Sequence, residues 1–228
     1  MIIAIDGPAG AGKSSVAKAC AKKLGFKCLD TGAMYRSVAW LEVQEGVALD
    51  DDDALGQLAR SCTIAFQHEA GNPIARGVSI NGHDVTEAIR TAQIDKAVSP
   101  VSAAGQVREA LVEEQRRIAS GGDYVIEGRD IGTVVCPDAQ LKIFLTASDE
   151  ERAHRRVRQN ADRGVGSIDY QEVLADIIRR DEADQNRGNS PLKPADDARV
   201  IDSTGTYIED IIESICVLAA LVQEGQEA

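Results

Sequence analysis

The chain has 228 residues, of which 43% are hydrophobic, and this length is enough to bury a substantial core within one domain. Its 37 Asp and Glu residues outnumber its 25 Lys and Arg residues, which gives a formal net charge of −12. This balance argues against a nucleic-acid polymer or an anionic membrane as the main partner. No stretch approaches the length of a membrane span and the N-terminus lacks the features of a secretory leader, so we expect a cytoplasmic protein.

Cysteine and histidine give no sign of a disulfide framework or a metal site. The five cysteines form no C-x-x-C pair and are odd in number, and the three histidines show no metal-ligand spacing. We expect most of the cysteines to be small buried apolar residues, and we assign the histidines no chemistry.

The first motif is GPAGAGKS, which begins at Gly7 and matches the phosphate-binding pattern G-x-x-x-x-G-K-[ST]. An apolar strand at 2–5 precedes it and apolar residues at helical spacing follow it, which is the setting that the motif requires and which disfavours an ordinary glycine turn. Glycines let successive backbone N–H groups turn inward on an anion. We expect Lys13 to reach the β- and γ-phosphates of a nucleotide and Ser14 to bind Mg²⁺. The residues expected to bind ATP are Gly7, Pro8, Ala9, Gly10, Ala11, Gly12, Lys13, Ser14 and Ser15.

A second strand is predicted at 26–30 and a helix at 34–43, with Thr31 in the turn between them. Turns at the carboxyl ends of strands line the ligand crevice of an open α/β sheet, so we expect Asp30, Thr31 and Arg36 to face that crevice. The four aspartates at 50–53 favour the acidic start of a surface helix over a metal site.

Residues 61–90 change character, with short β-like segments at 62–66, 77–80 and 84–85 and a hairpin signal at Asn81-Gly82. This pattern predicts an inserted antiparallel patch. A longer amphipathic helix is predicted at about 100–119, and the position of Arg108 off its apolar stripe predicts a solvent-exposed side chain.

A third strand at 124–127 ends in Glu127, which could hold a water molecule on Mg²⁺. A fourth strand at 141–145 leads into a helix at 149–160 that is rich in arginines. Two interpretations of these arginines have about equal support: a clamp for phosphate groups, or the solvated surface of a mixed-charge helix. Gly164 and Gly166 would let this segment hinge as a lid. In the next helix, at 169–184, Arg180 and Asp184 could pair on the surface or bind a sugar hydroxyl. A strand at 199–202 and an amphipathic helix at 207–222 complete the chain.

Five strand candidates alternating with helices predict an α/β fold, with a P-loop parallel five-stranded sheet, helices on both faces, a small antiparallel β insert and a helical lid. The guanine-reading N-K-x-D sequence of GTPases and the L-S-G-G-Q signature of transporter ATPases are absent. The short glycine loop, the insert and the arginine-rich lid together favour a small-molecule kinase.

Three motifs resemble bacterial cytidylate kinases: DGPAGAGKS from Asp6, LDTGAMYR from Leu29 and GRDIGT from Gly128. Further similarities follow in order along nearly the whole chain, and the segment at about 61–90 is similar to the extended monophosphate-binding region of the bacterial members. The resemblance implies one P-loop kinase domain over residues 1–228, with a lid at about 152–168. Many relatives carry Ser at the position of Thr31 and Asp at that of Glu127, and neither departure removes a functional group.

The resemblance implies that ATP, with Mg²⁺, donates its γ-phosphoryl group to CMP or dCMP in pyrimidine salvage, and that the protein is a monomer. A phosphate acceptor is already an anionic nucleophile, so alignment and charge neutralisation suffice without a catalytic base. The implied catalytic residues are Lys13, Arg155, Arg156 and Arg163. The implied substrate-binding residues are Thr31, Arg36, Ser99, Arg108, Arg129, Asp130, Arg180, Asp184 and Arg187, and the implied metal ligands are Ser14 and, through water, Glu127.

Two alternatives remain at this point. A kinase for shikimate or another nucleotide would share the glycine loop but lack the set formed by Arg108, Asp130, Arg180 and Asp184. A non-catalytic nucleotide-binding module would lack the arginine-rich lid.

Overall fold

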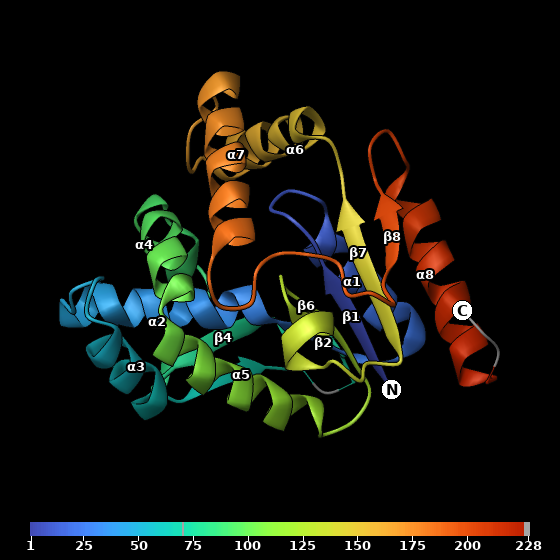
Figure 1. Cartoon of the computed structure of the whole chain (residues 1–228), viewed down its shortest axis with the longest axis horizontal. Coiled ribbons are helices and arrows are strands. Elements are labelled where there is room, and N and C mark those ends of the chain that lie inside the picture. The colour runs from blue at the N-terminus through green and yellow to red at the C-terminus, as the bar shows by residue number, and fades with distance from the viewer. Residues whose placement is uncertain (70, 226–228) are drawn as a thin grey trace. The chain divides into compact units, whose positions relative to one another are not determined.

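A computed structural model describes residues 1–69 and 71–225 of the chain, which divides into two compact units (Figure 1). The larger unit comprises Met1–Leu29 and the chain from Gly122 onward, and the smaller unit comprises Asp30–Gly121. Within the described ranges, none of the helices has the length and apolar character needed to cross a membrane.

The larger unit is built on a five-stranded parallel sheet with β1 (Ile2–Asp6) at its centre. The strand order is β2-β6-β1-β7-β8, and β1 pairs in parallel with both β6 and β7. Because both faces of β1 are covered, its sequence is a continuous apolar run, and Ile3, Ala4 and Ile5 are fully buried. The other strands are β2 (Lys27–Asp30), β6 (Tyr124–Glu127), β7 (Leu141–Thr146) and β8 (Arg199–Asp202).

The α-helices described in this unit are α1 (Lys13–Leu24), α6 (Asp149–Arg163), α7 (Tyr170–Asn186) and α8 (Ile208–Gln223), and a short π-helix, η2 (Ile131–Val135), follows β6. Helices α1 and α8 pack on each other beside the sheet, whereas α6 and α7 form a separate pair (Figure 1). Ala153, Val173 and Ile177 give the α6–α7 pair a small apolar core of its own. The predicted parallel sheet with flanking helices is thus confirmed.

The smaller unit combines helices with the expected antiparallel sheet, whose strand order is β3-β4-β5. Its only tryptophan, Trp40, has its ring 6.2 Å from that of His83. The helices are α2 (Thr31–Glu45), α3 (Asp52–Ser61), α4 (Ala92–Ala103) and α5 (Gly105–Ala119), with the short η1 (Ala88–Arg90), and the strands are β3 (Ile64–Gln67), β4 (Gly77–Ile80) and β5 (His83–Asp84).

Three predictions for this unit need correction. Helix α2 begins at Thr31 rather than at residue 34, because the Asp30 carboxylate accepts a hydrogen bond from the backbone N–H of Ala33 and caps the helix. The helix predicted at about 100–119 is two helices that break at Ala104, and the first begins well before the proline at its presumed start. Arg108 is buried, because its guanidinium packs over the ring of Tyr35 at 5.6 Å. By contrast, the aspartates at 50–53 do begin a helix, which Asp51 caps.

Replacement of Gly7 by alanine should destabilise the fold severely. The added Cβ would lie 1.9 Å from the carbonyl oxygen of Leu145 on β7, and Gly7 has a φ of +146° that other residues rarely adopt. We expect the free energy of unfolding in urea to fall by at least about 3 kcal/mol.

Gly25→Ala is the matched control. Gly25 also has a positive φ, +73°, but no described heavy atom lies within 4 Å of an added Cβ. We expect a loss of only about 1 kcal/mol from backbone strain. Equal losses in the two variants would contradict the role assigned to the close approach of β7.

Candidate functional site

The glycine loop between β1 and α1 has the geometry of an anion cradle. Gly7, Gly10 and Gly12 all have positive φ angles, so the loop turns in a way that side chains would oppose. Lys13 is buried, and its Nζ donates a hydrogen bond to the carbonyl oxygen of Pro8 at 2.7 Å. Burial, reinforced by the positive charge of Arg129, lowers the pKa of Lys13 to about 7. An anion in the loop would relieve this cost of burying a cation.

Ser14 and Glu127 meet although they are far apart in the sequence. Ile5 on β1 is paired with Glu127 on β6, which places the end of β6 beside the loop. The Ser14 hydroxyl donates to Oε2 of Glu127 at 2.8 Å, and Glu127 is buried. A hydroxyl and a carboxylate are suitable oxygen donors for Mg²⁺, which keeps several waters and phosphate oxygens as its other ligands. The described residues contain no cluster of three or more acidic, His or Cys side chains that could hold a metal alone.

Asp6, the last residue of β1, holds the turn that follows β6. Its two carboxylate oxygens accept hydrogen bonds from the backbone N–H groups of Ile131 and Gly132, at 2.8 and 2.7 Å. Burial raises the pKa of Asp6 to about 6 in spite of these two bonds. One carboxylate therefore fixes both the start of the glycine loop and the turn that carries Asp130.

Charged residues from this turn and from the end of α7 lie together. Nε of Arg129 lies 3.1 Å from Oδ2 of Asp184, and Nη1 of Arg187 lies 3.6 Å from Oδ1 of the same carboxylate. Nη2 of Arg187 lies 3.9 Å from Oδ1 of Asp130, and both of these side chains are largely buried. Four of the predicted substrate-binding residues thus form one network of alternating charge.

Arg152 on α6 connects three segments and was missed as a site residue. Its guanidinium donates to the carbonyl oxygen of Ala9 in the glycine loop at 2.9 Å and to that of Ala147 at 3.1 Å. It also forms an ion pair with Asp181 on α7 at 2.5 Å. The side chain is almost completely buried, so these contacts tie α6 and α7 to the loop. The mixed charge of the helix gave no sequence signal that would single out this arginine for burial.

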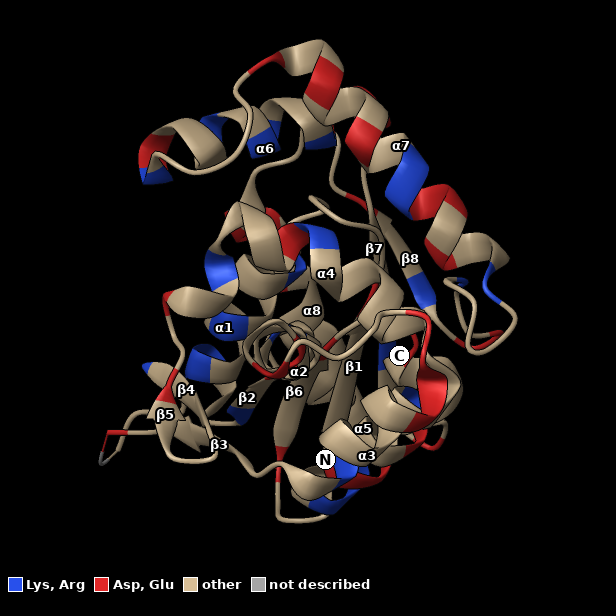
Figure 2. Cartoon of the chain, turned by 90° about the vertical axis from the view of Figure 1, so that its left-hand side faces the viewer, with Lys and Arg blue, Asp and Glu red and all other residues tan. Residues whose placement is uncertain are grey.

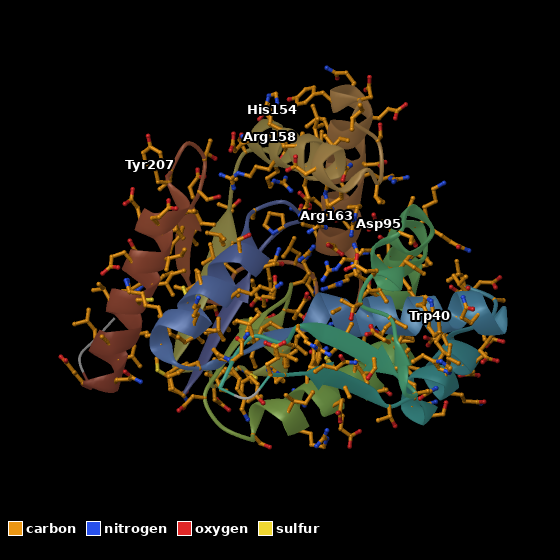
Figure 3. The ribbon with its side chains drawn as sticks, turned by 180° about the vertical axis from the view of Figure 1, so that it is seen from behind. Trp40, Asp95, His154, Arg158, Arg163 and Tyr207 are labelled. Carbon is orange, nitrogen blue, oxygen red and sulfur yellow. The ribbon has the colours of Figure 1, made fainter. Side chains whose placement is uncertain are left out.

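The remaining lid arginines differ in their surroundings. Arg155 donates to the hydroxyl and carbonyl oxygens of Ser203 at 2.9 and 2.7 Å, and to the carbonyl of Ala11 in the glycine loop at 3.4 Å. Arg156 is half-buried and lies 3.4 Å from the side-chain oxygen of Gln159. Arg163, at the end of α6, is exposed, as is Arg158 (Figure 3). Figure 2 shows the basic segments of α6 and the alternating basic and acidic segments of α7.

The smaller unit holds four of the five other predicted substrate-binding residues, and the fifth, Arg180, is half-buried on α7 of the larger unit. Thr31 is buried at the start of α2, and Ser99 is half-buried on α4. Nη1 of Arg36 donates to the carbonyl of Ile89 at 3.0 Å, and Nη2 forms an ion pair with Asp95 at 2.5 Å. Arg108, besides packing on Tyr35, donates to the carbonyl of Ser102 at 3.3 Å.

The parallel sheet and the cradle after its central strand define a P-loop protein. In agreement, the chain shares its fold with a gluconokinase from Sinorhizobium meliloti, with a TM-score of 0.51, 16% identity, and 97% and 93% of the two chains covered.

Sequence comparison identifies the particular family. The cytidylate kinase family model matches residues 3–221. The chain is 50% identical to a cytidylate kinase of Desulfitobacterium hafniense over 95% of this chain and 91% of the relative, and 49% identical to one of Pelotomaculum thermopropionicum over 93% of each. It is also 48% identical to a bifunctional pantoate ligase/cytidylate kinase of Trichormus variabilis, of which it covers 40%. The chain belongs to the cytidylate kinase family.

The buried carboxyl of Asp6 should make folding stability depend on pH. Its pKa rises from 3.8 to about 6 on folding, so the folded chain binds more protons than the unfolded chain between these values. The free energy of unfolding should therefore fall as the pH rises from 4 to 6. In Asp6→Asn this component disappears, so the stability of the wild type relative to the variant should drop by about 2 kcal/mol across that range.

Urea denaturation at several pH values measures this difference. Exposed Asp138 provides the matched control, because Asp138→Asn makes the same chemical change without burial. Curves for wild type and Asp6→Asn that stay parallel from pH 4 to 6 would show that Asp6 is not the group responsible.

Proposed function

We propose that this protein transfers the γ-phosphoryl group of ATP to CMP or dCMP, giving ADP and CDP or dCDP. The observation that carries the proposal is the contact between Ser14 of the glycine loop and Glu127, in a chain that matches the cytidylate kinase family over residues 3–221. Phosphoryl transfer needs a phosphate cradle, a metal-side carboxylate and cations, and all three kinds of group are present in the larger unit.

The glycine loop from Gly7 to Ser15 would hold the ATP phosphates, with Lys13 on the β- and γ-phosphates. The side chains of Ser14 and Glu127 would hold Mg²⁺, with Glu127 acting through water. When bound, Mg²⁺ would neutralise charge on the phosphates. The pKa of Lys13, lowered by burial, supports this role, because a buried cation gains most from an incoming anion.

The acceptor phosphate would be held by Arg36, Arg129 and Arg187, with Thr31 beside it. Guanidinium groups suit this task because their planar N–H forks match phosphate oxygens. In the larger unit, Arg129 and Arg187 share the carboxylate of Asp184, which keeps the two cations close together without a ligand. No base is needed, because the acceptor phosphate is already a nucleophilic anion.

Recognition of cytosine calls for an acceptor toward N4 and donors toward N3 and O2. We assign these roles to Asp130, Arg108 and Ser99, and we assign the sugar contacts to Arg180 and Asp184. Asp130 and Arg108 are both buried, which supports the assignment, because the surrounding protein restricts the orientation of their polar groups. Uracil reverses the pattern at N3 and at its exocyclic group, so these residues would disfavour UMP.

The lid at about 152–168 would close over the transferring group through Arg155, Arg156 and Arg163. The insert at about 61–90 would serve monophosphate binding, within one kinase domain over residues 1–228. We further propose that the protein is cytoplasmic and, as its family resemblance suggests, a monomer, and gel filtration tests its size.

Purified protein with ATP and Mg²⁺ should release ADP in the presence of CMP or dCMP and much more slowly with UMP, AMP or shikimate. A coupled assay of ADP with each acceptor separately measures this. UMP turnover equal to CMP turnover would contradict the assigned cytosine site, and a lack of acceptor-dependent ADP release would favour a binding module over a kinase.

Replacement of Glu127 by alanine should lower kcat by about 100-fold or more while changing the affinity for CMP little, because its proposed partner is the metal and not the acceptor. Steady-state kinetics and calorimetric titration with CMP separate the two effects. Glu127→Asp is the matched control and should keep most of the activity, since it retains the carboxylate. A loss of CMP binding with kcat unchanged would contradict the metal-side role.

A further inference from the structure

Arg36 forms an ion pair with a carboxylate of the chain itself, that of Asp95. Its Nη2 lies 2.5 Å from Oδ1 of Asp95, which is on the first turn of α4 (Figure 3). Its Nη1 donates to the carbonyl of Ile89 at 3.0 Å. Arg36, Ile89 and Asp95 all belong to the smaller unit, so both contacts lie within one compact unit. The guanidinium is therefore oriented by two oxygen acceptors.

Helix capping does not account for the position of Asp95. The N-cap of α4 is Thr91, whose hydroxyl accepts the backbone N–H of Ile94, while the carboxylate of Asp95 is directed to Arg36. The side chain of Asp95 is 34% exposed and that of Arg36 is 18% exposed, so solvent reaches the ion pair. An ion pair that solvent can reach can exchange one anion for another.

A phosphate group is a stronger partner for Arg36 than this carboxylate. The Asp95 contact uses one oxygen and one guanidinium nitrogen, whereas a phosphate can accept two parallel N–H bonds and carries more negative charge. If Asp95 stays in place when phosphate binds, the two anions repel each other, and if it moves, its ion pair is lost. In both cases the aspartate opposes the phosphate.

We propose that Asp95 is a positioning residue for Arg36 that also competes with the acceptor's monophosphate for the guanidinium, and so weakens binding of the nucleoside monophosphate. The proposal rests on the role in acceptor binding that the proposed function gives to Arg36. Removal of the charge at position 95 should strengthen acceptor binding, which is the opposite of what loss of a purely structural contact would do.

Asp95→Asn tests this, because asparagine keeps the shape and an oxygen acceptor but removes the charge. Calorimetric titration without ATP should show about fivefold tighter binding of CMP, which corresponds to about 1 kcal/mol. KM for CMP should fall by a similar factor while KM for ATP stays the same. The gain should shrink at about 0.5 M salt, because salt screens the interaction between charges. Unchanged or weaker CMP binding would overturn the proposal, and Asp95→Ser replaces the variant if asparagine prevents folding.

Two further variants make the test specific. Glu87→Gln is the matched control: it removes one negative charge from an exposed residue of the same unit, and Glu87 makes no side-chain cap bond to η1. It should leave CMP affinity unchanged. In an Arg36→Ala background, Asp95→Asn should tighten CMP binding clearly less than it does in the wild-type background, because only the direct repulsion between the two anions then remains. An equal gain in both backgrounds would show that Asp95 does not act through Arg36, and would overturn the proposal.

The proposal and the proposed function can fail separately. Absence of CMP-dependent ADP release by the wild type would overturn the proposed function alone. Inorganic phosphate is then the probe for Arg36, and Asp95→Asn should bind it more tightly than the wild type does. Equal or weaker phosphate binding by the variant would overturn the role of Asp95.

Discussion

The parallel pairing of β1 with β6 and β7 is the constraint on which the larger unit depends. It places the end of β6 beside the glycine loop, so that Ser14 reaches Glu127. It also brings β7 so close to Gly7 that no side chain fits there. The two oxygens of Asp6 then fix the turn after β6 to the same strand. The glycine loop and the turn after β6 are thus positioned by backbone pairing and one buried carboxylate.

Charge compensation is the second organising feature. The chain is strongly acidic, yet its proposed function requires a concentration of arginines. Each unit resolves this by giving site arginines internal acceptors: Asp184 serves two arginines in the larger unit, and Asp95 serves Arg36 in the smaller one. A buried cation without such a partner would be costly, whereas a paired one is held ready in a fixed orientation. The same pairing means that an incoming phosphate must compete with carboxylates that the chain already carries.

The sheet, the glycine loop and the antiparallel insert could be predicted from the sequence, because each depends on a local pattern of apolar residues and glycines. The start of α2 could not, since the side-chain cap at Asp30 brings Thr31 and Gly32, two weak helix formers that were expected to lie in a turn, into the helix. Periodicity also failed for Arg108, because a long side chain can bury itself on an aromatic ring that only the folded unit brings near. Arg152 was hidden for a similar reason: its partners, Ala9 and Asp181, are remote in sequence.

The location of the single tryptophan has a practical consequence. Trp40 lies four residues after Arg36 on α2, so the two side chains project from neighbouring turns of one helix. Tryptophan emission from the unlabelled wild-type chain therefore originates entirely in the smaller unit, next to the arginine assigned to the acceptor. Intrinsic fluorescence can therefore report on the smaller unit without a dye, and without background from the glycine loop.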